Sequence, residues 1–204
     1  MRKWLGLAAS SALIALIAVV AVPARAQDND NKVPSWEVGG GYTFRSYDYA
    51  PVGAGSPPLT TNGWDVMADR MVFRKWLSVA AQVDGTYTSE GYNTSVYSAM
   101  IGPQVYLFGH RRKLTPYFQA LFGEGYTRYL IPKSGGYPAL AVSTHDYTWQ
   151  GGGGIDYSWK PHWNIRVIQF DYENTRFFTS NPTQGNYKIS VGIMYRFGKL
   201  KKGR

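Results

Sequence analysis

The chain has 204 residues, no cysteine, a formal net charge of +9 and an aromatic content of 16%. The lack of cysteine excludes a disulfide scaffold, a lipid-anchored lipoprotein and a zinc–thiolate protein. A basic charge of this size would suit a nucleic-acid binder. The export signal described next argues against that class, and we expect no nucleic-acid partner.

The N-terminal segment has the features of a cleaved secretory signal peptide. Arg2 and Lys3 precede an apolar run over residues 5–22, and residues 24–26 read Ala-Arg-Ala, a small-residue cleavage site. The alternative is a retained transmembrane anchor, because an apolar run of this length is near the spanning threshold. The expected organisation is a signal peptide over 1–26, a lead-in over 27–34, one barrel domain over 35–198 and a basic tail over 199–204.

The remaining chain alternates at a period of two between aromatic or aliphatic residues and small or charged ones, which predicts β-strands. The expected strands cover residues 36–45, 62–71, 77–87, 95–108, 116–129, 147–159, 164–174 and 187–197. The last strand is about as long as a tilted strand that crosses a bilayer. Its apolar face, which we expect to contact lipid, consists of Tyr187, Ile189, Val191, Ile193, Tyr195 and Phe197. A strand of a soluble sandwich is the alternative for this segment alone.

The connections between these strands alternate in length. Long connections, most of them rich in glycine and proline, cover residues 46–61, 89–94, 130–144 and 177–185, and short ones lie near 73–75, 109–113 and 160–162. Transmembrane barrels have this asymmetry, with short periplasmic turns, longer external loops and an even number of strands. The sequence therefore predicts an all-β fold: a closed eight-stranded antiparallel up-and-down transmembrane β-barrel with both termini in the periplasm. A lipocalin-like soluble barrel would instead turn its apolar face inward.

Three positions depart from simple alternation. Pro103 lies within a strand, which is typical of an edge strand or a bulge. Glu124 falls on the apolar side of its strand, and a bulge near residues 123–125 would correct this. Arg166 and Asp171 have opposite parity, so a second bulge is expected near Ile168.

A barrel of about eight strands has an interior that side chains fill, so no wide channel is expected. The charged residues on the mixed faces should point inward and pair, because an unpaired buried charge is costly. The expected lumen charges are Glu37, Arg45, Asp65, Asp69, Asp84, Asp156, Asp171, Lys188 and Arg196.

Three segments resemble a known family. They are Gly-Gly-Gly-Gly-Ile-Asp-Tyr at 151–157 with Arg166 beyond it, the run at 169–177, and Gly-Ile-Met-Tyr-Arg-Phe-Gly at 192–198. The chain resembles small bacterial outer-membrane β-barrel proteins, the OmpA/OmpX-like or opacity-type porin-like domains of Gram-negative bacteria. This resemblance implies insertion in the outer membrane and no shared enzymatic activity. The basic tail after Phe197 departs from the family pattern, in which the assembly machinery reads a terminal aromatic residue.

Two motifs were considered for chemistry. The glycine run at 151–154 could cradle a phosphate, but no helix pattern and no Lys-Ser/Thr follow it, and glycines that let aromatic neighbours pack are the better explanation. His145 and Asp146 could serve a membrane hydrolase, although such a site needs further partners at the rim. We expect no catalytic site, cofactor or metal.

Partners are expected at both rims of the barrel. Basic residues gather at the predicted periplasmic rim, where anionic lipid headgroups could bind: Arg70, Arg74, Lys75, residues 110–113, Lys160 and residues 199–204. Aromatic residues of the predicted external loops could bind an unidentified extracellular ligand: Tyr47, Tyr49, Tyr137, Phe177 and Phe178. The other expected partners are lipopolysaccharide, phospholipid and the outer-membrane assembly machinery, and the barrel is expected to be a monomer.

Three functions follow from these features. The first is a non-enzymatic integral outer-membrane barrel that supports the envelope and presents external loops for interaction or adhesion. The second is a small passive pore, and the third is an outer-membrane hydrolase that uses His145 and Asp146.

Overall fold

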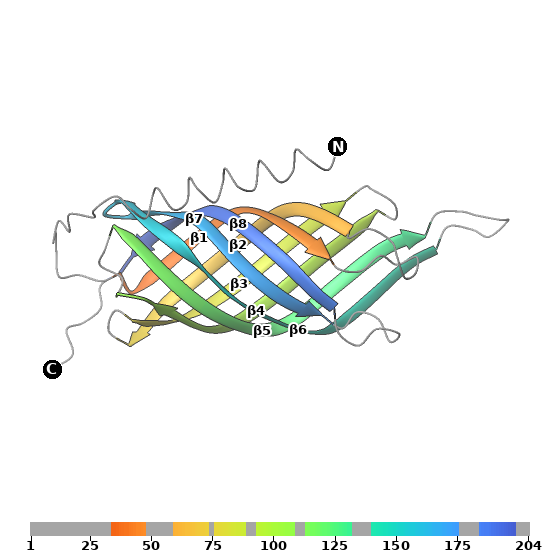
Figure 1. Ribbon diagram of the computed structural model, residues 1–204, viewed down its shortest axis with the longest axis horizontal. Coiled ribbons are helices and arrows are strands. Elements are labelled where there is room, and N and C mark those ends of the chain that lie inside the picture. The colour runs from red at the N-terminus through yellow and green to blue at the C-terminus, as the bar shows by residue number, and fades with distance from the viewer. Residues whose placement is uncertain are drawn as a thin grey trace, which may run out of the picture.

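The computed structural model describes residues 34–47, 59–73, 76–88, 93–108, 113–131, 140–175 and 184–198, which form one closed antiparallel barrel (Figure 1). Each strand pairs with the next along the chain, and β8 pairs with β1 to close the ring. The strands are β1 (Trp36–Tyr47), β2 (Leu59–Phe73), β3 (Leu77–Thr88), β4 (Thr94–Tyr106), β5 (Leu114–Ile131), β6 (Leu140–Lys160), β7 (Trp163–Thr175) and β8 (Gln184–Phe197). The predicted fold class is confirmed. The predicted signal peptide, most of the lead-in and the basic tail lie outside the described residues.

The outward face of the barrel is apolar, as the alternation predicts. The six residues assigned to lipid contact on β8, from Tyr187 to Phe197, are between 40% and 53% exposed. Aliphatic residues such as Val66, Val83 and Val191 also point outward and leave the barrel with an apolar surface. A closed barrel can expose this face to lipid because every backbone group is paired within the sheet.

Aromatic side chains flank the outward aliphatic band toward both ends of the barrel. We call the end that carries Trp36 and Phe197 the terminal end, and the end that carries Ile131 and Leu140 the hairpin end. The exposed aromatics toward the terminal end include Trp36, Phe73, Trp76, Phe108, Trp159, Trp163, Tyr195 and Phe197. Those toward the hairpin end are Phe44, Trp64, Tyr87, Tyr147, Trp149 and Tyr187. Two such girdles are typical of the interfaces of a transmembrane barrel.

The β5–β6 hairpin is much longer than the sequence predicts. β5 has 18 residues and β6 has 21, whereas the other strands have 12 to 15. The prediction of a loop over residues 130–144 was therefore wrong at both of its ends. Residues 140–146 read Leu-Ala-Val-Ser-Thr-His-Asp, in which β-branched residues favour a strand despite the high polarity. Figure 1 shows this hairpin projecting past the other strands.

One of the two predicted bulges is present. The register of β7 against β8 shifts between Arg166 and Gln169, which confirms the bulge near Ile168. The bulge near residues 123–125 is absent, because β5 keeps one register with β6 along its whole length. Glu124 simply points outward beside His145. Pro103 pairs with Val79 inside the β3–β4 ladder, so it lies in neither an edge strand nor a bulge.

Glycines make room for large side chains inside the barrel. A Cβ at Gly154 would clash with the backbone oxygen of Ile168 and would lie 2.7 Å from the Tyr117 hydroxyl oxygen and 2.9 Å from its Cζ, so only glycine fits at this position. A Cβ at Gly151 would meet nothing closer than a Trp149 ring atom at 3.8 Å. Cβ atoms at Gly152 and Gly153 would clash with the backbone oxygens of Phe170 and Tyr117, so close packing requires glycine at 152–154 but not at 151. Among the described residues, no helix has the length and apolarity needed to cross a membrane.

Candidate functional site

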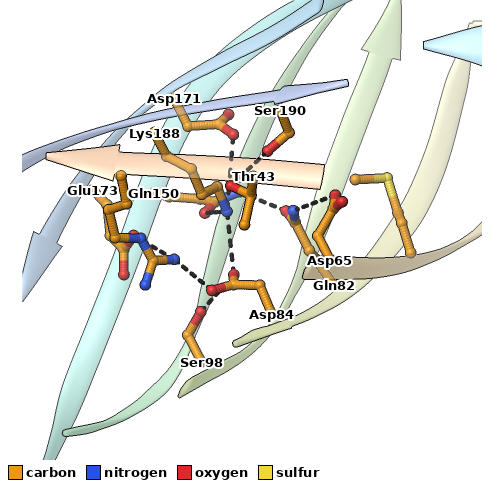
Figure 2. A network of polar contacts seen from close by, with 12 residues as sticks. Thr43, Asp65, Gln82, Asp84, Ser98, Gln150, Asp171, Glu173, Lys188 and Ser190 are labelled. Carbon is orange, nitrogen blue, oxygen red and sulfur yellow. Dashed lines mark hydrogen bonds and ion pairs between the residues drawn. The ribbon is translucent and has the colours of Figure 1, made fainter. Parts of the chain in front are cut away.

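The lumen of the barrel holds a continuous network of polar side chains, which we call the lumen network. Its centre is Lys188 on β8, whose Nζ lies 2.6 Å from Gln150 Oε1 and 3.3 Å from Asp84 Oδ1. Figure 2 shows Lys188 between side chains of opposite walls of the barrel. Lys188 and Asp84 are both fully buried. A lysine can be buried in this position because acceptors on several strands lie within reach of its ammonium group.

Arg45 forms the second cationic centre of the network. Its Nη2 lies 2.5 Å from Asp84 Oδ2 and 3.0 Å from Glu173 Oε2, and its Nη1 donates to the Tyr47 hydroxyl at 2.8 Å. Asp84 also accepts from Ser98 at 2.7 Å. One carboxylate is therefore shared by Arg45 and Lys188, which holds β1, β3 and β8 together across the lumen.

Amide side chains carry the network to the remaining strands. Gln150 Nε2 donates to Gln82 Oε1 at 2.8 Å, and Gln82 Nε2 donates to Asp65 Oδ2 at 3.3 Å. Gln119 Nε2 donates to Asp171 Oδ1 at 3.0 Å. With these links the network has members on every strand of the barrel.

A second group of charges surrounds Arg166, nearer the terminal end. Its Nε lies 3.0 Å from Asp156 Oδ1, and its Nη2 lies 3.8 Å from Asp69 Oδ2. The guanidinium carbon lies 4.4 Å from the centroid of the Tyr117 ring. Gln169 connects this group to the centre, because it accepts from Arg166 at 2.8 Å and donates to Asp171 at 2.6 Å.

The closing seam between β1 and β8 carries the last ion pair. Arg196 Nε donates to Glu37 Oε1 at 2.6 Å, and Arg196 Nη1 donates to Ser158 at 2.9 Å. Outside the barrel, the rings of Trp36 and Phe197 stack with centroids 6.5 Å apart. The β1–β8 ladder is therefore stabilised by a polar contact on its lumen face and by an aromatic contact on its outer face.

All nine charged residues assigned to the lumen from the sequence lie inside the barrel, none more than 7% exposed. Two further lumen charges were not assigned there, Arg166 and Glu173, which are 2% and 0% exposed. Tyr47 was assigned to an external loop, and this is wrong. It belongs to β1, is 4% exposed and receives a hydrogen bond from Arg45. The other predicted loop aromatics, Tyr49, Tyr137, Phe177 and Phe178, lie outside the described residues.

The hairpin end presents a different surface. Among the described residues, 129–131 of β5 and 140–142 of β6 pair only with each other, and 143–147 of β6 pair only with residues 124–128 of β5. We call residues 129–131 and 140–147 the projecting hairpin. Near its base, His145 Nδ1 lies 3.0 Å from Glu124 Oε1, and both side chains are more than 60% exposed. The His145 ring also packs against Tyr126, with centroids 4.6 Å apart. The side chains of residues 140–147 are exposed or partly exposed.

The two residues considered for hydrolysis do not act together. Asp146 Oδ1 accepts a hydrogen bond from the backbone N–H of Tyr147, while His145 pairs with Glu124. Neighbouring residues of a strand point to opposite faces, so the two side chains diverge. Within the described ranges, no group of three or more His, Asp or Glu side chains is arranged to hold a metal ion.

A polar recess lies at the hairpin end of β2, β3 and β4. It has a volume of about 530 Å³ and is lined by Thr60, Asn62, Tyr87, Thr88, Asn93, Thr94 and Ser95. The β2–β3 ladder ends at the pair Asn62 and Tyr87, so β2 continues past this point without β3 beside it. The recess is the notch that this difference in strand ends leaves in the rim.

Comparisons with known proteins agree with this architecture. Residues 12–197 match the family described as outer membrane protein beta-barrel domain. No curated protein sequence matches the chain.

Three similar solved structures show the same fold at low sequence identity. Neisserial surface protein A has a TM-score of 0.61 at 10% identity, over 82% of this chain and 100% of that chain. Ail, the attachment invasion locus protein of Yersinia pestis, has a TM-score of 0.57 at 14% identity, over 81% and 100%. Ail in complex with the heparin analogue sucrose octasulfate has a TM-score of 0.53 at 15% identity, over 79% and 97%.

Proposed function

Since this chain belongs to the family of outer membrane protein β-barrel domains, we propose that it is a non-enzymatic outer-membrane protein that presents its hairpin end to an extracellular partner. In this proposal both termini lie in the periplasm, and the projecting hairpin stands outside the cell. The barrel is the anchor, and recognition belongs to the surface beyond it.

The projecting hairpin is the observation that carries this proposal. β6 has 21 residues, about twice the 9–11 that a tilted strand needs to cross a bilayer. Its residues 140–142 pair only with 129–131 of β5, and the side chains of 140–147 are exposed or partly exposed, so this segment adds nothing to the packing of the lumen. Binding residues are found most often on such segments held by a rigid scaffold. Ail has been solved in complex with a heparin analogue, so this fold accommodates a ligand-binding surface.

Adhesion of bacteria that display the protein tests this function. Thr127 and Thr144 are paired, so an Asn-Gly turn placed between them removes residues 128–143 and closes the hairpin at its base. We expect bacteria with the full protein to adhere to surfaces coated with heparin or extracellular-matrix proteins, and the shortened variant to lose this adhesion. A heat-modifiable gel shift of both proteins controls for folding. Equal adhesion of the two strains, or none above cells without the protein, would contradict the proposal.

The orientation can be tested separately because the chain has no cysteine. A single cysteine in place of Ser143 should react with a membrane-impermeant maleimide on intact cells. One in place of Lys160, at the terminal end, should react only after the outer membrane is permeabilised. The reverse pattern would place the hairpin in the periplasm.

The pore alternative finds no support in the lumen, because charged and amide side chains cross it from every strand. Planar-bilayer recordings of the folded protein should therefore remain at baseline. For the hydrolase alternative, lipid A and peptide substrates should remain unchanged on incubation with the protein. Steady conductance or turnover that His145→Ala abolishes would overturn this part of the proposal.

A further inference from the structure

A row of aromatic rings crosses the closing seam on the outer face of the terminal end. The ring of Trp163 packs edge-on against Tyr195 with centroids 5.1 Å apart, and the rings of Tyr195 and Phe197 stack at 6.2 Å. The stack of Phe197 on Trp36 carries the row from β8 to β1. We call these four rings the seam row, and each of them is between 38% and 43% exposed. The seam row is therefore a broad aromatic surface that faces away from the lumen, at the level where aromatic side chains meet lipid headgroups.

Arg70 of β2 lies at one end of the seam row. It opposes Trp36 directly in the β1–β2 ladder, and its side chain is exposed. Its guanidinium carbon is 5.2 Å from the centroid of the Trp36 ring. A cation–π contact of this kind positions the guanidinium on the outer face and leaves N–H donors available to an anion.

Lys160 of β6 lies at the other end of the seam row. Its backbone pairs with Trp163, and its Nζ is 4.6 Å from the centroid of the Trp159 ring, which is 54% exposed. The ammonium group therefore lies on the outer face beside an aromatic ring, as expected for a lysine at a membrane interface. Neither Arg70 nor Lys160 forms an ion pair with another residue that the structure describes.

The sequence adds further basic charge at this end of the chain's strands. Residues 74–75, 109–112 and 199–204 adjoin strand ends at the terminal end, and they contain eight Lys or Arg residues and no Asp or Glu. The lead-in over residues 27–33 carries two Asp and one Lys. These segments therefore carry an excess of positive charge, which favours an anionic membrane surface over a zwitterionic one.

We propose that anionic phospholipids of the periplasmic leaflet bind at the two ends of the seam row, with headgroup phosphates at Arg70 and Lys160 and acyl chains along the rings. A guanidinium matches two oxygens of a phosphate with parallel N–H donors, and an ammonium group binds phosphate as a point charge. The aromatic contact is the same for neutral and charged lipids, so the two cations supply the preference. The inference rests on the proposed orientation, which places the terminal end at the leaflet that consists of phospholipid.

The test uses the protein without its expected signal peptide, labelled with 5-fluorotryptophan and folded in nanodiscs. Phosphatidylglycerol replaces phosphatidylcholine stepwise, and fluorine NMR follows the resonances, each assigned by replacing one tryptophan with phenylalanine. The resonances of Trp36 and Trp159 should shift and saturate at a low phosphatidylglycerol content. Those of Trp64 and Trp149, toward the hairpin end, are internal controls and should shift little. Inorganic phosphate added to phosphatidylcholine nanodiscs should move none of them.

Single substitutions of the two cations separate binding from a general effect of surface charge. Arg70→Gln should raise the phosphatidylglycerol fraction needed for half of the Trp36 shift about fivefold, the factor that one basic residue near an anionic surface contributes. Lys160→Gln should do the same for Trp159, and each variant should leave the other resonance's curve unchanged. Arg128→Gln, at the exposed base of the hairpin, is the matched control and should leave both curves unchanged. A heat-modifiable gel shift of each variant controls for folding.

Four outcomes would overturn the inference. They are the absence of a shift at Trp36 and Trp159, shifts of the same size at all four tryptophans, shifts that Arg70→Gln and Lys160→Gln leave unchanged, and equal shifts with inorganic phosphate. Both leaflets of a nanodisc have the same lipids, so this result does not depend on orientation. Its failure would leave the proposed function standing, whereas a reversed maleimide pattern would overturn that function and the assigned leaflet without changing the NMR result.

Discussion

The lumen network and the projecting hairpin are built from the same strands yet have opposite environments. In the lumen, Arg45 and Lys188 are fully buried and touch acceptors on facing walls. Near the hairpin base, His145 Nδ1 lies at a similar distance, 3.0 Å, from Glu124 Oε1, but both side chains are mostly exposed to solvent. Removing one member of a buried ion pair strongly lowers the free energy of unfolding, whereas a solvent-exposed pair contributes little to it. We therefore expect the stability of the barrel to depend far more on the lumen network than on the hairpin.

The largest change in the free energy of unfolding is expected when the same substitution, arginine to methionine, is made in the lumen and near the hairpin. Arg45→Met leaves Asp84 and Glu173 without their shared guanidinium and should lower the free energy of unfolding by about 3–5 kcal/mol. Arg128→Met, at the exposed base of the hairpin, should change it by less than about 0.5 kcal/mol. Urea unfolding in lipid vesicles, followed by tryptophan fluorescence, measures both. Adding Glu173→Gln to Arg45→Met should restore part of the loss, and equal effects of the two single variants would remove the distinction.

A smaller effect, with opposite signs, is expected within the glycine run. Gly154→Ala places a methyl group against the Ile168 backbone oxygen and the Tyr117 ring and should cost about 1–3 kcal/mol, as overpacking does. Gly151→Ala enters open space and should stabilise the barrel by about 0.5 kcal/mol, because alanine restricts the unfolded chain. The midpoints of urea unfolding should move in opposite directions. Movement in the same direction would show that Tyr117 can move aside.

The smallest effect is expected at the exposed pair near the hairpin base. Glu124→Gln should reduce stability by no more than about 0.5 kcal/mol, because the pair is solvated and screened. The difference from the parent should vanish in high salt. A loss above about 1 kcal/mol that salt does not change would indicate that the hairpin supports the barrel.

The strands and their two faces could be predicted because lipid and lumen impose a strict period of two. Lys188 and Arg196 alternate with Ile189 and Tyr195, and one-residue errors would place charge in lipid. The same logic located the bulge near Ile168, since Arg166 and Asp171 could not both face inward without one. Carried one step further, it would also have identified Arg166 and Glu173 as lumen residues.

Parity arguments fail where the strand leaves the membrane. Glu124 broke the alternation because it lies on the outward face near the hairpin end, where solvent accepts a charge, and no bulge was needed. The prediction of Tyr47 as a loop residue is wrong because its hydroxyl accepts a buried hydrogen bond from Arg45, which the preference of aromatic residues for external loops does not indicate. The polar recess could not be predicted at all, because it depends on where β2 and β3 stop relative to one another.

The seam between β1 and β8 differs from every other ladder in the time at which it can form. The other ladders join strands that follow each other along the chain, whereas Glu37 and Arg196 are 159 residues apart in sequence. Closing a loop of that length costs about 2.5 kcal/mol more than closing one of ten residues. A barrel in which only this seam is open would be a sheet with two unpaired edges. The stacked rings of Trp36 and Phe197 and the Glu37–Arg196 ion pair stabilise this closing seam. Weakening them should slow the closure of the barrel more than it lowers the free energy of unfolding of the closed barrel.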